Sequence, residues 1–219
     1  MGEIYKFNNK VSQYVCKIFL ALFFLTLLSC DKEIERLDNY LVEFATVIKD
    51  GNNYTFKLDN ETLLTPDGGI KFNGDTGDRV IVNWIPSNNS IVRINRVTSI
   101  YTSSIQDEGY SNLYIKEPVK IQSVWLSGDY LNMIVEIEYH SEPHSIAIVR
   151  DIDSETIDLY FAHSTNDDPR GYPRVMYASF LISSLRNLYN TNETPFNLFI
   201  NTHNGIRQFQ FNYKYNTTN

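Results

Sequence analysis

Residues 121–139 read IQSVWLSGDYLNMIVEIEY. A mostly apolar segment ends at Leu126, and Ser127-Gly128-Asp129 then supplies a turn signal. From Leu131 to Tyr139, apolar residues occupy every second position, with glutamates among the residues between them. Successive side chains of a strand point to opposite faces, so this alternation places one face in a core and the other in solvent. The stretch therefore predicts a β-hairpin.

The same rhythm of short strands and turns continues to the end of the chain. Asn204-Gly205 is the strongest hairpin signal. The last strand sets four aromatic residues against polar ones, and we expect these four to face the core: Phe209, Phe211, Tyr213 and Tyr215. The remaining strands are expected at 146–150, 157–161, 174–180 and 196–200. Residues 119–219 thus favour a seven-stranded antiparallel β-sandwich.

The first half of the body has a similar pattern. Alternation begins at Tyr40 and leads, through two turns, to a Gly-rich loop from Pro66 to Asp78. Five strands and one long loop within about 65 residues favour a closed barrel, because closure hides the strand edges. We expect an OB-like barrel in residues 40–118, with Ser103–Pro118 as the connection to the sandwich. The fold class is therefore all-β.

The N-terminus carries a targeting signal. Lys6, Lys10 and Lys17 precede the apolar run Ile18–Leu28, whose 11 residues fall short of a membrane span. The sequence Leu27-Leu28-Ser29-Cys30 looks like a bacterial lipoprotein signal. We expect a signal helix in residues 1–29 that is removed, lipidation of Cys30, and a tether in residues 30–39.

Lipidation at Cys30 places the protein in the cell envelope, anchored to the outer membrane. The tether begins with acidic residues (Asp31, Glu33), which resemble the export signals of surface lipoproteins. This favours the cell surface over a periplasm-facing position.

Composition excludes several classes of function. Residues 1–29 hold three lysines and one glutamate, so their removal takes the formal charge from −7 to −9, which argues against nucleic acid as a partner. The two cysteines are Cys16, in the signal, and Cys30, which the lipid would consume. The mature body then has no disulfide, no thiol nucleophile and no thiolate metal site.

Three stretches carry a family resemblance. They are Val42–Val47, Gly77–Asn83 and Val124–Asn132, of which the last is the most specific. Together they resemble the NigD-like family of bacterial lipoproteins. The resemblance implies an N-terminal OB-like domain and a C-terminal β-sandwich, and the family name comes from a bacteriocin cluster with a proposed immunity role. It implies no catalytic or binding residues.

One loop concentrates polar chemistry. His163 shares parity with Ile157, Leu159 and Phe161, and Asp167, Asp168 and Arg170 follow it. A histidine with a carboxylate can bind a ligand or act as a general acid or base. His140 and His144 flank Pro143 in a turn, where i,i+4 spacing does not align ligands, so we expect a solvated hairpin tip and no metal site.

These observations leave three hypotheses. The first is a non-enzymatic binding module for a protein partner, including bacteriocin immunity. The second is a glycan-binding accessory lipoprotein of an uptake system, which would expose aromatic side chains such as Tyr213 and Tyr215. The third is a hydrolase using His163 with Asp167 or Asp168. No cofactor motif is present in the sequence.

Overall fold

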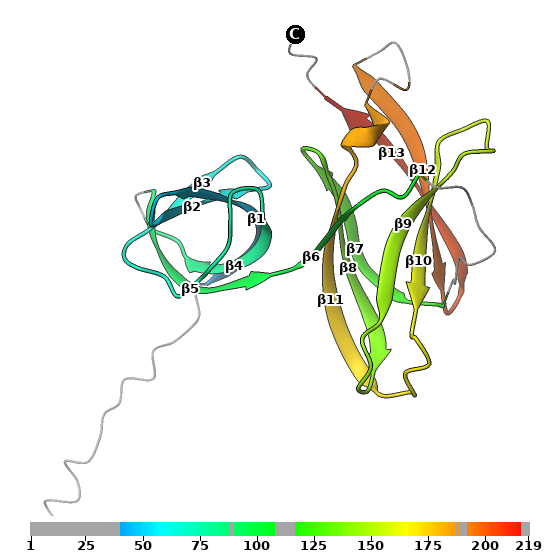
Figure 1. Ribbon diagram of the computed structural model, residues 1–219, viewed down its shortest axis with the longest axis horizontal. Helices are drawn as coiled ribbons and strands as arrows, with labels where there is room; N and C mark the ends of the chain where they lie inside the picture. The colour runs from blue at the N-terminus through cyan, green and yellow to red at the C-terminus, as the bar shows by residue number, and fades with distance from the viewer. Residues whose placement is uncertain (1–39, 88–89, 108–116, 187, 189–191, 216–219) are drawn as a thin grey trace, which may run out of the picture. The chain divides into compact units, whose positions relative to one another are not determined.

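The computed structural model describes residues 40–87, 90–107, 117–186, 188 and 192–215. A closed five-stranded barrel is followed in these residues by two four-stranded sheets (Figure 1). The expected all-β fold, a barrel and then a sandwich, is confirmed. The signal helix, the tether and Cys30 lie outside the described residues. In the part of the chain that is described, no helix is long and apolar enough to cross a membrane.

Strand β1 closes the barrel because both of its edges are paired. β1 (Leu41–Asp50) pairs antiparallel with β2 (Asn53–Leu58) and with β4 (Arg79–Ile85). β3 (Leu63–Pro66) joins β2 to β5 (Ile91–Ser99), so the order β1-β2-β3-β5-β4 returns to β1. The barrel core consists of Ala45, Val47, Phe56, Leu58, Leu64, Val80, Val82, Trp84 and Val92.

The sandwich consists of two sheets, with strand orders β13-β12-β10-β9 and β6-β11-β8-β7. Its strands are β6 (Tyr101–Ser104), β7 (Lys120–Ser127), β8 (Tyr130–Tyr139), β9 (Ser145–Asp151), β10 (Asp158–Ser164), β11 (Tyr172–Leu181), β12 (Glu193–Thr202) and β13 (Gly205–Lys214), with the 3-10 turn η1 (Ser183–Leu185) between β11 and β12. The inward-facing residues of both sheets form one core, which includes Leu131, Met133, Val135, Phe161 and Leu198.

The hairpin predicted from residues 121–139 is present as β7 and β8. Ser127 pairs with Tyr130, and Gly128 has a φ of 53°, a left-handed conformation that favours glycine. The hairpin expected at Asn204-Gly205 joins β12 and β13; its turn residues are His203 and Asn204, and Gly205, with a φ of 100°, begins β13 opposite Thr202. Tyr213 and Tyr215 are buried, as expected of core residues.

The sandwich differs from the prediction in two respects. In the described residues it has eight strands instead of seven, because β6 begins directly after β5 and pairs with β11 of the sandwich. In addition, the pairs β6/β11 and β10/β12 run parallel. Turn signals predict only antiparallel neighbours, since a two-residue turn joins antiparallel strands and parallel partners are far apart in sequence.

Candidate functional site

The site is built around a buried arginine at the start of β4. The side chain of Arg79 is 3% exposed and lies where the barrel contacts the outer face of the sheet containing β8 and β11. Its Nη2 donates to Asp59 Oδ1 at 2.8 Å and to Asn132 Oδ1 at 2.9 Å. Its Nε donates to Ser179 Oγ at 3.3 Å, and its Nη1 to Thr46 Oγ1 at 3.0 Å. One guanidinium therefore bonds both domains.

Asp59 balances this charge and makes its own contacts with the sandwich. Its Oδ2 accepts the indole N–H of Trp125 at 3.0 Å and the amide N–H of Asn132 at 3.2 Å. Its backbone oxygen accepts the hydroxyl of Ser127 at 3.1 Å. A buried ion pair is tolerated when further hydrogen bonds satisfy both charges, and that condition is met here.

Aromatic rings surround the contact that Arg79 and Asp59 make with the sandwich. The Arg79 guanidinium lies 4.7 Å from the ring centroid of Tyr130 and 5.8 Å from that of Phe44. The rings of Phe44 and Trp125 are nearly perpendicular, at 83°, with centroids 4.8 Å apart. Phe44 also contacts Tyr177 edge-on, with the centroids 6.1 Å apart. Such T-shaped pairs stabilise their arrangement by about 1 kcal/mol beyond the buried area.

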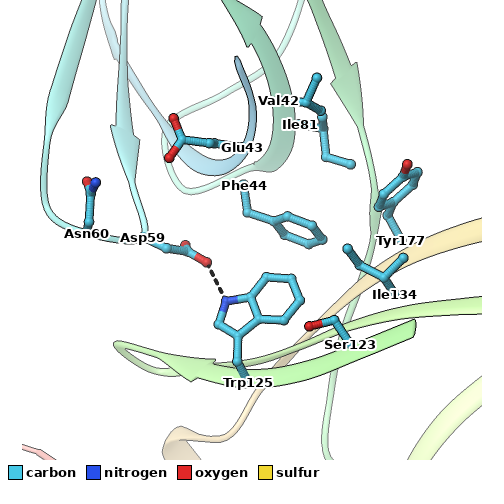
Figure 2. Close-up of a pocket in the computed structure, with 10 residues that line it drawn as sticks. All are labelled: Val42, Glu43, Phe44, Asp59, Asn60, Ile81, Ser123, Trp125, Ile134 and Tyr177. Atoms are coloured by element: carbon cyan, nitrogen blue, oxygen red, sulfur yellow. Dashed lines mark hydrogen bonds between the residues drawn. The ribbon is translucent and has the colours of Figure 1, made fainter. Parts of the chain in front are cut away.

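A cavity of about 480 Å³ lies beside this cluster, between β1 and β4 of the barrel and β7, β8 and β11 of the sandwich. Figure 2 shows Phe44 and Trp125 near its centre, with Ile134 and Tyr177 on one side and Asn60 on the other. The cavity is lined by Val42, Glu43, Phe44, Asp59, Asn60, Ile81, Ser123, Trp125, Ile134 and Tyr177. Its size and its mainly apolar walls with a few polar groups are typical of a ligand-binding pocket between domains.

The charged groups that line the cavity are both acidic. Asp59 is neutralised by Arg79, as described above. The other is Glu43, whose Oε2 accepts the indole N–H of Trp84 at 2.9 Å. An occupant with an apolar body and a donor or cationic group therefore matches the walls better than an anion does.

The residues singled out at the end of β10 and in the loop that follows it take different positions. His163, 2% exposed, and Asp168 are buried, whereas Asp167 and Arg170 are exposed. Asp167 has a left-handed backbone, with a φ of 64°. Arg170 pairs at 3.4 Å with Glu138 at the surface. The structure thus brings together two of the four predicted residues.

His144, which the sequence analysis assigned to a solvated tip, lies between His163 and Asp168. Its Nδ1 is 2.9 Å from His163 Nε2, and its Nε2 is 3.2 Å from Asp168 Oδ2. His163 Nδ1 lies 3.1 Å from the backbone oxygen of Glu117. All four ring nitrogens are engaged, so neither histidine has a nitrogen left for a substrate in this arrangement, and the hydrolase hypothesis loses its general base.

Asp168 anchors the turn after β8. Its carboxylate accepts backbone N–H groups from His140, Ser141 and Glu142, at 2.7, 3.0 and 2.9 Å. Burial alone would raise the pKa of Asp168, but these hydrogen bonds and the one with His144 outweigh it and hold the pKa well below its usual range. Among the described residues, no group of three or more His, Cys, Asp or Glu side chains is arranged so that it could hold a metal ion.

The sequence analysis did not predict the buried contact of Arg79 with Asp59, but the sequence contains one indication of it. Arg79 begins the strand Arg79–Ile85, whose other residues are almost all apolar. A charged residue in such a strand needs a partner, but the identity of that partner, Asp59, depends on folding.

A barrel and a sandwich joined by a buried polar contact define a class of two-domain β-proteins. A model of the NigD-like C-terminal beta sandwich domain matches residues 102–213. The chain belongs to the NigD-like family. No curated protein matches the chain.

Solved structures share this architecture. A protein described as toxin-related from Parabacteroides distasonis has a TM-score of 0.71 and 26% identity, over 80% of this chain and 94% of its own. A NigD-like immunity protein from Bacteroides caccae has a TM-score of 0.63 and 23% identity, over 80% and 96%. A protein described as a lipoprotein from Bacteroides fragilis has a TM-score of 0.58 and 13% identity, over 83% and 100%.

Proposed function

We propose that this chain is a lipid-anchored protein of the cell envelope that acts as a non-enzymatic binding module for a protein partner. The observation that carries the proposal is the aromatic-lined cavity between barrel and sandwich. Its walls include the rings of Phe44, Trp125 and Tyr177. Buried aromatic side chains dominate the energetics of protein interfaces, and a side chain inserted among them excludes water on both partners.

The chemistry of the cavity indicates the kind of partner. The acidic lining favours an apolar side chain that ends in a donor or a cation, and the acidic charge of the whole chain attracts basic partners during encounter. Among relatives of the same fold, one is named an immunity protein and another is described as toxin-related. Within the proposal, the specific role is therefore immunity to a bacteriocin.

A bacteriocin challenge tests this role. We expect deletion of the gene to sensitise cells to at least one toxin of a bacteriocin panel, and the wild-type gene to restore resistance. Tyr177→Ala removes one wall of the cavity and should fail to restore it. Tyr172→Ala, a matched control at a site that is 84% exposed, should restore it fully. Unchanged sensitivity of the deletion strain across the panel would count against immunity.

The proposed anchor is Cys30, and residues 1–29 are the proposed signal peptide. A single acyl chain binds a membrane only marginally, whereas a diacylglyceryl cysteine supplies two chains and a lasting anchor. We propose attachment to the outer membrane, with the surface-exposed side favoured. Cys30→Ser should leave an uncleaved, unlipidated precursor. Persistence of a mature-sized, membrane-held protein in this variant contradicts the anchor.

The glycan-binding hypothesis has less support. It predicts an exposed aromatic pair that lines a groove, but the pair singled out from the sequence is not exposed: Tyr213 is 1% exposed and Tyr215 is also buried. Phe209 and Phe211 are partly buried and pack against the sandwich core. The aromatic column of β13 therefore stabilises the fold.

A further inference from the structure

His144 and His163 of the sandwich lie in a row of three hydrogen bonds, and the number of protons that these bonds require can be counted. The row begins at the backbone oxygen of Glu117, passes through both imidazoles and ends at the carboxylate of Asp168. Carbonyl and carboxylate oxygens only accept hydrogen bonds, so His163 Nδ1 and His144 Nε2 must each carry a proton. The contact between the two rings requires one more. Three contacts therefore need three protons, and two neutral imidazoles carry only two.

We propose that His144 and His163 hold this extra proton between them as a buried imidazolium, and that the shared charge is a pH-sensitive latch between two loops. The latch joins the turn at residues 140–144 to residues 163–168, which comprise the end of β10 and the loop after it. It is separate from the cavity between barrel and sandwich, and it does not depend on the proposed function.

Asp168 is the counter-ion of the latch. It accepts three backbone N–H groups, and acceptance of several such bonds stabilises the charged carboxylate over the protonated acid. A protonated Asp168 could complete the row without a charged histidine, but protonation would weaken Oδ2 as the acceptor of the His140 N–H. The ionised carboxylate and one imidazolium satisfy every contact.

Among the described residues, the other titratable and charged groups around the pair are Tyr101, Glu117, Glu138, Tyr139, Glu142, Arg170, Arg174, Tyr177 and His203. The carboxylate of Glu117 accepts the backbone N–H and the hydroxyl of Thr165. Glu138 pairs with Arg170, and the Arg174 guanidinium lies 4.3 Å from the ring centroid of Tyr139. Asp168 is therefore the carboxylate that bonds directly to the pair.

The hydrogen bond between the two rings is lost if the singly protonated pair gains a second proton, and also if it loses the shared one. A second proton places two N–H groups against each other across 2.9 Å. Burial lowers the pKa of His163 and the charge of His144 lowers it further, whereas the hydrogen bond to the Glu117 carbonyl and the charge of Glu117 oppose them only in part. Loss of the shared proton, in contrast, leaves two acceptors facing each other in one contact of the row. The latch is closed only between these two limits.

This predicts a stability maximum near the ordinary histidine pKa of about 6.5. Well below that pH, the unfolded chain binds two protons on these residues and the folded chain one, so acid favours unfolding. Well above it, the folded chain still holds one proton and the unfolded chain none, so base also favours unfolding. As long as the folded pair holds one proton, the pair makes the equilibrium constant for unfolding about tenfold larger for each pH unit away from 6.5, whether the pH falls or rises.

Nitrogen-15 NMR of the histidine rings tests the proton count directly. At pH 6.5 we expect one doubly protonated ring in the pair and the Nδ1–H tautomer of His163. A doubly protonated ring at either position supports the shared proton. Two neutral rings at that pH would overturn the proposal. Because this measurement uses the wild-type protein, it does not depend on whether any variant folds.

Denaturant unfolding from pH 5 to 8 supplies the second test. The double variant His144→Gln/His163→Gln removes both titrating rings, so its difference from wild type should be largest near pH 6.5. His203→Gln, at an exposed histidine, should keep the wild-type profile. A wild-type and double-variant difference that does not change with pH contradicts the latch.

Discussion

The guanidinium of Arg79 donates a 2.9 Å hydrogen bond to the side-chain oxygen of Asn132, which lies 53 residues further along the chain. Arg79 belongs to the stretch Gly77–Asn83, and Asn132 ends the stretch Val124–Asn132. These stretches carried two parts of the family resemblance. Their contact shows what they do physically, because each supplies polar groups that satisfy the other at the boundary between barrel and sandwich.

The first prediction concerns the buried charge. Arg79→Met leaves the Asp59 carboxylate without its cation and Ser179 Oγ without the Arg79 donor. Asn132 Oδ1 loses one of its two donors and keeps the hydroxyl of Ser179. Breaking a buried pair by removing one partner costs about 3 kcal/mol or more, and Asp59 keeps some contact with water, so we expect a loss near 3 kcal/mol in the free energy of unfolding. Denaturant unfolding followed by tryptophan fluorescence measures it.

Lys57→Met is the matched control. Lys57 pairs with Glu61 at 2.5 Å, but the two side chains are 41% and 71% exposed. Exposed pairs contribute between about 0.2 and 1 kcal/mol, so this variant should be close to wild type. Equal losses in the two variants would show that the contact between barrel and sandwich does not depend on Arg79.

The second prediction concerns Tyr213, which links the two sheets of the sandwich. Its hydroxyl donates to Asp129, in the turn between β7 and β8, and accepts from Arg186 Nε at 2.9 Å. Burial and the bond to Asp129 raise the pKa of Tyr213 to about 12, against the opposing effect of Arg186. The unfolded chain releases this proton from about pH 10, so stability should fall as the pH rises above 10.

Tyr213→Phe should remove that alkaline component and cost about 1 kcal/mol at neutral pH through the lost hydrogen bonds. Tyr172→Phe, at an exposed tyrosine, should change neither quantity. Denaturant unfolding at pH 8 and pH 11 measures both effects. If Tyr213→Phe loses as much stability between pH 8 and pH 11 as wild type does, the alkaline loss of stability comes from groups other than Tyr213.

The fold could be predicted from local sequence patterns because most strands show an alternation of apolar and polar residues, and most hairpins contain recognisable turn residues. The pair β7/β8 and the Asn204-Gly205 turn are examples. Strand β6 was missed because four residues, Tyr101–Ser104, are too short and polar to show a period. Its partner, β11, lies far along the chain, and no local signal specifies such a pairing.

The site was predicted less completely, for the same physical reason. Parity placed His163 beside the core face of its strand, and it is buried there. His144 was expected in solvent because it follows Pro143 in a polar turn. Its burial depends on the loop that carries Asp168, which folds over the turn. Sequence pattern shows how polar a loop is but not which other loop covers it.

The third prediction concerns close backbone approach at Gly171. A Cβ at this position would lie 2.0 Å from the backbone oxygen of Tyr139, whereas a Cβ at Gly68 would meet nothing within 4 Å. Backbone cannot yield as a flexible side chain does, so Gly171→Ala should cost about 2–3 kcal/mol, a typical penalty for overpacking. Gly68→Ala should be nearly neutral. Thermal unfolding of the two variants makes the comparison, and equal melting temperatures would contradict the close approach.

The last prediction concerns the acid limit of the sandwich. Hydrogen bonds hold the pKa of Asp168 below its ordinary value of 3.8, so its stabilising contribution is present above that pH and is lost as the pH falls through the lower, folded-state pKa. Asp168→Asn removes the charge that the three N–H groups of the 140–142 turn bind, and should lower the melting temperature by several degrees at pH 7. The variant should also lose part of the acid dependence, since the titrating group is gone.

Asp167→Asn is the control for this prediction, because Asp167 is the adjacent residue, carries the same charge and is exposed. It should melt as wild type does from pH 3 to pH 7. Hydrogen exchange adds a local measurement: the backbone N–H groups of His140, Ser141 and Glu142 should exchange faster in Asp168→Asn only. Equal exchange in both variants would mean that the turn is held by contacts other than the carboxylate, and the latch would then lose its counter-ion.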